Sequence, residues 1–151
     1  MSYSYVIDAT PVLDTSQYTS GDVLFVAQEV KDFFPDLQSA VNLMSIVALD
    51  GDDQAQVFDI VFSNANITLG TINSAISISD ADCAKIIGYV VFASGDKNDT
   101  INSNLWVKSN INQIMKSSGL TTSVWISGVC RGGTPTYTAS GMKLKIGIVS
   151  P

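Results

Sequence analysis

The chain has 151 residues, a formal net charge of −6, 46% hydrophobic residues and only 15% charged ones. It has the length of one ordinary domain and enough apolar residues to fold, which excludes a long disordered segment. A single arginine and scattered lysines exclude nucleic-acid binding, which needs several cations against phosphates. The absence of histidine excludes the Ser-His-Asp and Cys-His groups of nucleophilic enzymes.

Short runs rich in Val, Ile and Thr, separated by turn residues, predict strands rather than helices. In chain order, strands are expected at residues 5–9, 22–30, 39–49, 54–64, 87–93, 104–111, 123–130 and 142–149. Between the third and fourth of them, Asp50 and Gly51 have the form of a hairpin turn, because glycine tolerates the positive φ that such turns require. The pattern predicts an all-β sandwich or barrel of about eight strands, formed by residues 1–151 as a single domain.

One short helix is expected within residues 77–88. Ser79 followed by Asp82 has the form of a capping box, and Gly88 is placed to end the helix. No apolar run approaches the roughly 18 residues that a membrane helix requires, so we expect no membrane partner.

Some of the expected strands are apolar on both faces. The last strand is half-apolar, with Leu144 and Ile146 on one face and Lys143 and Lys145 on the other. In contrast, the runs at 39–49 and 54–64 carry apolar side chains in both phases. The second face of such strands must be covered by a loop, another layer or a neighbouring subunit.

The two tryptophans fall on the more polar face of their strands by simple alternation. Leu105 and Val107 occupy the apolar phase, which places Trp106 on the other face. A β-bulge reverses such a phase, and tryptophan is commonly a core residue. The alternative is a contact surface, where Trp, Tyr and Arg are enriched. The candidate interface residues are Trp106, Trp125, Arg131 and Tyr137.

Candidate chemistry is sparse. Asp50, Asp52 and Asp53 form the densest acidic cluster, and calcium prefers several oxygen ligands on one loop. The glutamate and the spacing of an EF-hand are missing, so a polar loop tip is the simpler interpretation. Arg131 lies at the corner before the last strand, where it pairs with a carboxylate of its own chain or of a partner. We expect no metal, no cofactor and no enzymatic activity.

Three stretches carry a resemblance to a known group of proteins: DTSQYTSGDVLF near the start, ISDADCAKIIGYVVF in the middle and RGGTPTYTASGMKLKIGIV at the end. In their order and spacing, the chain resembles small virion proteins of tailed bacteriophages, notably accessory capsid proteins that decorate or cement the shell. The resemblance implies a jelly-roll-like β-sandwich that binds the outside of an icosahedral shell. It also implies the phage major capsid protein as partner and self-association as a homotrimer.

The sequence therefore predicts a structural virion protein, located on the outer capsid surface, that reinforces the shell by binding between capsid subunits. The alternative is a tail or fibre module that binds host-surface carbohydrate. In that case Trp106, Trp125 or Tyr137 stacks on sugar rings, and the three aspartates of the acidic cluster bind calcium.

Overall fold

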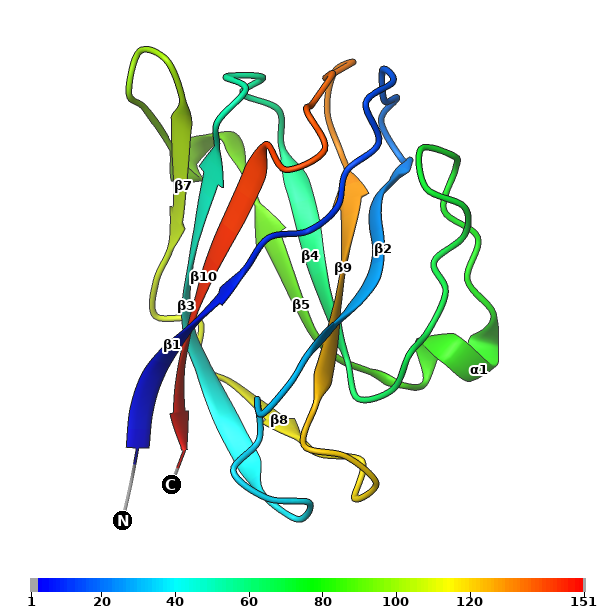
Figure 1. Ribbon diagram of the computed structural model, residues 1–151, viewed down its shortest axis with the longest axis vertical. Helices are drawn as coiled ribbons and strands as arrows, with labels where there is room; N and C mark the ends of the chain where they lie inside the picture. Colours follow the sequence, from blue (N-terminus) through cyan, green and yellow to red (C-terminus); the bar gives the residue numbers. More distant parts are fainter. Residues whose placement is uncertain (1–2, 151) are drawn as a thin grey trace.

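The computed structural model describes residues 3–150, which form ten strands in two antiparallel sheets packed face to face (Figure 1). The strands are β1 (Tyr3–Ala9), β2 (Val23–Val30), β3 (Ala40–Asp50), β4 (Phe58–Ser63), β5 (Ile86–Phe92), β6 (Lys97–Asp99), β7 (Asn104–Lys108), β8 (Gln113–Lys116), β9 (Val124–Cys130) and β10 (Met142–Ser150). One helix, α1 (Asp80–Cys83), and one 3-10 turn, η1 (Ser94–Asp96), lie outside the sheets.

The order of the strands is that of a jelly roll. One sheet, called here the β1 sheet, has the order β1-β10-β3-β7-β6, and β8 pairs with β3. The other, called the β2 sheet, has the order β2-β9-β4-β5. Without the short strands β6 and β8, each sheet has four strands, and the chain passes repeatedly from one sheet to the other. The expected fold class is confirmed.

The hairpin expected at Asp50 and Gly51 does not form. Strand β3 ends at Asp50 in the β1 sheet, and β4 begins at Phe58 in the β2 sheet, so the chain crosses between the sheets. The left-handed backbone occurs at Asp53 and Ala55, with φ of 54° and 59°. A two-residue turn signal is local, whereas the partner of β3 is decided by which apolar faces meet in the core.

The helix is shorter than expected. Its N-cap is confirmed, since the hydroxyl of Ser79 accepts a hydrogen bond from the N–H of Asp82 at 3.1 Å. The second bond of a capping box is not formed, because the carboxylate of Asp82 accepts from Thr68 and Lys85 instead. Gly88 does not end it, because β5 has already begun at Ile86. A Cβ at Gly88 would lie 2.8 Å from the sulfur of Met115, so close packing accounts for the glycine. Within residues 3–150, no helix is long and apolar enough to cross a membrane.

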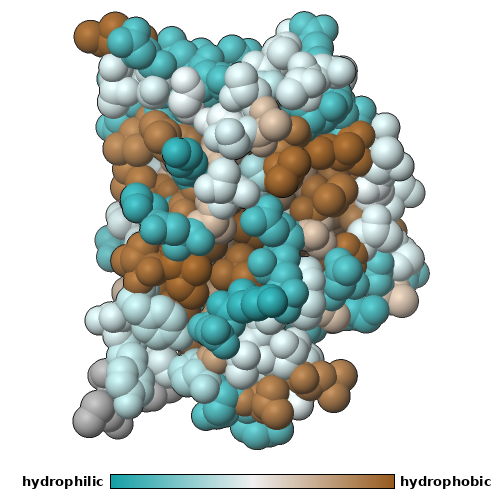
Figure 2. Space-filling view, viewed as in Figure 1, coloured by the Kyte–Doolittle hydropathy of each residue, from teal (hydrophilic) through white to brown (hydrophobic). Residues whose placement is uncertain are grey.

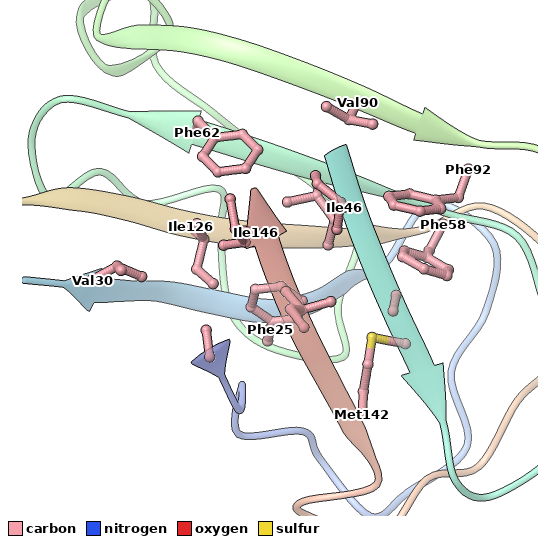
Figure 3. Close-up of a cluster of buried hydrophobic side chains, with 14 of the residues drawn as sticks. Phe25, Val30, Ile46, Phe58, Phe62, Val90, Phe92, Ile126, Met142 and Ile146 are labelled. Carbon is pink, nitrogen blue, oxygen red and sulfur yellow. The ribbon is translucent and has the colours of Figure 1, made fainter. Parts of the chain in front are cut away.

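The core lies between the two sheets and consists of apolar side chains from both (Figure 3). The ring of Phe58 stacks on that of Phe92 with centroids 4.6 Å apart and meets Trp106 edge-on at 5.4 Å. The ring of Phe25 lies against Gly128, where a Cβ would come within 2.4 Å of it. The large rings therefore interlock across the interface between the sheets.

The outer face of the β2 sheet is partly covered by the chain itself, whereas Val26, Tyr89 and Val91 of this sheet remain exposed. Residues 64–79, the green segment beside β2 in Figure 1, lie along this sheet. They are tied to the start of β2, where Val23 donates to the carbonyl of Ser74 at 2.8 Å and accepts from Asn73 at 2.9 Å. A second apolar cluster fills the space beneath them, formed by Val23, Val61, Ile67, Leu69 and Val129. A loop thus explains why β4 is apolar on both faces.

Candidate contact surface

On the outer face of the β1 sheet, several apolar side chains are half-buried or exposed and lie next to one another. On β3 and β7, Val47 lies opposite Val107, and Leu49 lies opposite Leu105. These four side chains form an apolar strip across the middle of the sheet. We call the whole surface the open face. Its residues are Val6, Asp8, Val47, Leu49, Leu105, Val107, Ile114, Lys143, Lys145 and Val149.

The open face is hollowed. A groove of about 370 Å³ lies over the apolar strip, between Asp8, Leu105 and Lys143. Two further hollows, of about 230 and 280 Å³, share Val149 as a lining residue. Figure 2 shows brown apolar areas, interrupted by teal polar ones, on the left of the molecule, where Figure 1 places β1, β10, β3 and β7. Apolar patches rimmed by polar groups are typical of contact surfaces.

The charges on the open face are mainly positive, although the whole chain has a net charge of −6. Lys145 lies 2.9 Å from Asp8, and both side chains are largely exposed, so this ion pair contributes little to stability. Lys143 forms no ion pair within the described part of the chain. Two lysines against one aspartate favour an apolar partner surface that carries acidic groups.

Two of the four candidate interface residues are core residues instead. Trp106 is 1% exposed and Tyr137 is 3% exposed, so neither offers surface to a partner, and their assignment to an interface is wrong. The ring of Trp106 fills the space beside Phe58, which turns Leu105 and Val107 outward. Alternation along β7 does indicate this surface, but the prediction had the two faces reversed. Leu105 and Val107 lie on the outer face, and Trp106 lies in the core.

Arg131 and Trp125 lie on the β2 sheet and not on the open face. The Nε of Arg131 donates to Oδ2 of the buried Asp59 at 2.7 Å, and its Nη2 donates to the hydroxyl of Tyr89 at 3.1 Å. The Tyr89 hydroxyl also donates to Asp59. Of the two pairings expected for Arg131, the one within its own chain is observed. Trp125 is half-buried, and its role at an interface stays a prediction.

This polar cluster changes the pKa of its members. Burial, together with the hydrogen bond to Asp59, raises the pKa of Tyr89. The hydrogen bond to Asp59 is also the main cause that raises the pKa of Arg131. Because Asp59 is nearly buried, the guanidinium and the hydroxyl are needed to satisfy its carboxylate. The cluster therefore stabilises the end of β9 and is structural.

The three carboxylates of the acidic cluster, Asp50, Asp52 and Asp53, accept hydrogen bonds from other groups of the chain. Asp50 accepts hydrogen bonds from three backbone N–H groups of the crossing loop, those of residues 52, 54 and 55. Asp52 accepts from the backbone and the hydroxyl of Thr138, and Asp53 accepts from the side chain of Asn104 at 2.7 Å. Within residues 3–150, no group of three or more acidic, Cys or His side chains is arranged to hold a metal ion.

Asp50 should make stability depend on pH. Burial raises the pKa of its carboxyl above the ordinary 3.8, although the three N–H donors act against this. The folded chain then binds the proton more tightly than the unfolded chain. The contribution to the free energy of unfolding is complete below 3.8 and is lost as the pH rises through the raised value.

The measurement is urea denaturation of the wild type and of Asp50→Asn across this acidic range. The difference in unfolding free energy between the two should fall as the pH rises. Asp99→Asn, which changes an exposed carboxylate on the short strand β6, is measured alongside as the control substitution. A flat difference for Asp50→Asn would contradict the assignment.

The fold and the surface together define a jelly-roll β-sandwich in which residues 64–79 cover part of the β2 sheet and the β1 sheet presents the open face. No protein-family model matches the chain, and no curated protein matches it. Among solved structures, it is similar to the infectious bursal disease virus VP2 subviral particle, with 14% identity and a TM-score of 0.42, over 98% of this chain and 32% of that one.

Similarity extends to the Gx strain of infectious bursal disease virus, with 12% identity and a TM-score of 0.38 over 99% of this chain and 31% of that one. For Desmodium yellow mottle tymovirus, the values are 14% and 0.34 over 99% and 80%. The chain thus spans about a third of the length of the bursal disease virus chains. Identities and TM-scores this low carry no inference about what this chain does.

Proposed function

We propose that this chain is a structural virion protein that decorates a tailed-phage capsid and reinforces it by binding between capsid subunits through the open face. The single observation that carries the proposal is the contiguous apolar strip of Val47, Leu49, Leu105 and Val107 on the β1 sheet. Residues 64–79 cover an apolar cluster of the β2 sheet, whereas this strip stays half-buried or exposed and borders a groove. The resemblance carried by the three sequence stretches supplies the identity of the partner, the major capsid protein on the outer surface of the shell.

The energetics suit a cement role. A contact of standard size removes about 800 Å² from each partner, which a four-stranded sheet face can supply. Burial of the apolar strip provides the main driving force, and Lys143 and Lys145 orient the contact toward acidic groups of the shell. Repetition of one moderate contact over many equivalent sites gives avidity well beyond the affinity of a single copy. For self-association, the resemblance implies a trimer.

Most of the residues that the carbohydrate-binding alternative requires are not available to a ligand. Trp106 and Tyr137 are buried in the core and cannot stack on a sugar ring, which leaves Trp125. The carboxylates of Asp50, Asp52 and Asp53 are engaged with backbone and side-chain donors of the chain. The structural role is therefore the better-supported proposal.

The test is a comparison of capsids with and without the protein under heat and under osmotic shock. Capsids that carry the protein should survive conditions in which bare capsids open, and adding the purified protein back to bare capsids should restore survival. Equal survival in both shocks would contradict the reinforcing role. Absence of the protein from sedimented capsids would contradict binding itself.

A further inference from the structure

The free edges of most outer strands are protected. Along β2, the backbone is tied to residues 72–76 at Val23, and its pairing with β9 shifts register twice. Along β5, the N–H of Tyr89 donates to the side chain of Gln113 at 3.3 Å, and just beyond the strand that of Ala93 donates to Asp96 at 2.9 Å. Bulges and side-chain caps of this kind prevent a sheet from pairing with further strands.

Strand β1 has none of these protections. It pairs with β10 over seven consecutive residues, Tyr3–Ala9, without a register shift. Within residues 3–150, no side chain forms a hydrogen bond to the backbone of β1. The other outer strands of this sheet, β6 and β8, have only three and four residues. The side chain of Val6, in the middle of β1, is 65% exposed.

We propose that β1 pairs in antiparallel fashion with β1 of a second copy of this chain, across a two-fold axis through Val6. In this register Val6 lies opposite its own copy, Tyr5 lies opposite Ile7, and Ser4 lies opposite Asp8. All seven residues of the strand then have partners. A symmetric contact of this kind needs one self-complementary surface, which an unprotected antiparallel edge provides.

The charges favour this register over those with the axis closer to Asp8, and the pairing of all seven residues favours it over those with the axis closer to Tyr3. With the axis at Val6, the two copies of Asp8 are four residues, or about 14 Å, apart along the strands, since each residue advances the chain by about 3.4 Å. That separation exceeds the screening length of about 8 Å at physiological ionic strength. Each carboxylate also keeps its own partner, Lys145. An axis at Asp8 would instead set the two carboxylates directly opposite each other, where like charges are destabilising.

The pairing goes beyond the proposed function, because it requires no capsid, and it gives a two-fold dimer in place of the trimer that the resemblance implies. It joins the two β1 sheets into one continuous sheet and places two open faces side by side, since Val6 belongs to both the edge and the open face. The test therefore uses the isolated full-length chain. Failure of the pairing would leave capsid binding untouched, and failure of capsid binding would leave the pairing untouched.

The experiment measures the molar mass of the wild type and its variants by light scattering and sedimentation over a range of concentrations. The wild type should form a dimer. Val6→Lys, which sets two lysines opposite each other at the axis, should raise the dissociation constant at least tenfold. The matched control is Val91→Lys, the same change at a 52% exposed valine on the capped strand β5, and it should leave the dimer intact.

A mixing experiment tests the register and guards against loss of folding. Val6→Lys and Val6→Glu should each be monomeric alone, and an equal mixture of the two should form mixed dimers, because the axis sets lysine against glutamate. A wild type that stays monomeric into the millimolar range overturns the proposal, as does a wild-type trimer. Dimers of Val6→Lys as tight as those of the wild type overturn it too.

Discussion

Val107→Asp should abolish the protection of capsids and leave the protein folded. The side chain of Val107 is 37% exposed on the apolar strip, so a carboxylate there is hydrated in the free protein. In the contact, the same carboxylate must lose its water without a designed partner, which costs on the order of 1–3 kcal/mol even with partial compensation. That cost corresponds to about a tenfold to hundredfold loss of affinity per copy. The loss recurs at every site on the shell.

The measurement is sedimentation of the variant with capsids, followed by the heat and osmotic tests. Val26→Asp makes the same change at a more exposed valine of the β2 sheet and should bind capsids as the wild type does. Thermal melting of both variants should lie close to that of the wild type, because surface substitutions usually change stability by less than about 0.5 kcal/mol. Full capsid binding by Val107→Asp would show that the open face is not the contact surface.

Trp106→Ala should lower the free energy of unfolding by about 3–5 kcal/mol, the usual cost of removing a large buried aromatic side chain. The indole is 1% exposed and packs edge-on against Phe58, so its loss leaves a cavity between the sheets. At roughly 2–4 °C per kcal/mol for a chain of this size, the midpoint of thermal unfolding should fall by on the order of 10 °C.

Trp125→Ala is the matched control, because the second tryptophan is only half-buried. We expect a clearly smaller loss of stability than for Trp106→Ala, measured by thermal and urea unfolding of both proteins. Measuring capsid binding of the same two variants tests the remaining interface prediction for Trp125. A Trp106→Ala protein that is as stable as the wild type but fails to bind capsids would contradict the core role of Trp106 and indicate that it lies in the contact surface.

The sequence by itself determined the kind of fold and the position of most strands. Expected strands such as 22–30, 39–49 and 142–149 agree with β2, β3 and β10 to within one residue. Alternation along β10 correctly places Leu144 and Ile146 inward and Lys143 and Lys145 outward. These features follow from local patterns, because a half-buried strand requires apolar residues at every second position. The N-cap at Ser79 is local in the same sense.

Only the tertiary structure decided which face of each strand points into the core and what covers the other face. The candidate site follows from this, because it is an outer face that stays uncovered. Alternation alone left the phase of β7 open, and it was settled by the space beside Phe58, which admits the ring of Trp106 and turns Leu105 and Val107 outward. Likewise, Asp50 and Gly51 carry a turn signal, but the two strands they join go to different sheets. Long-range packing chooses which faces meet, and two residues of local sequence cannot encode a partner that lies tens of residues away.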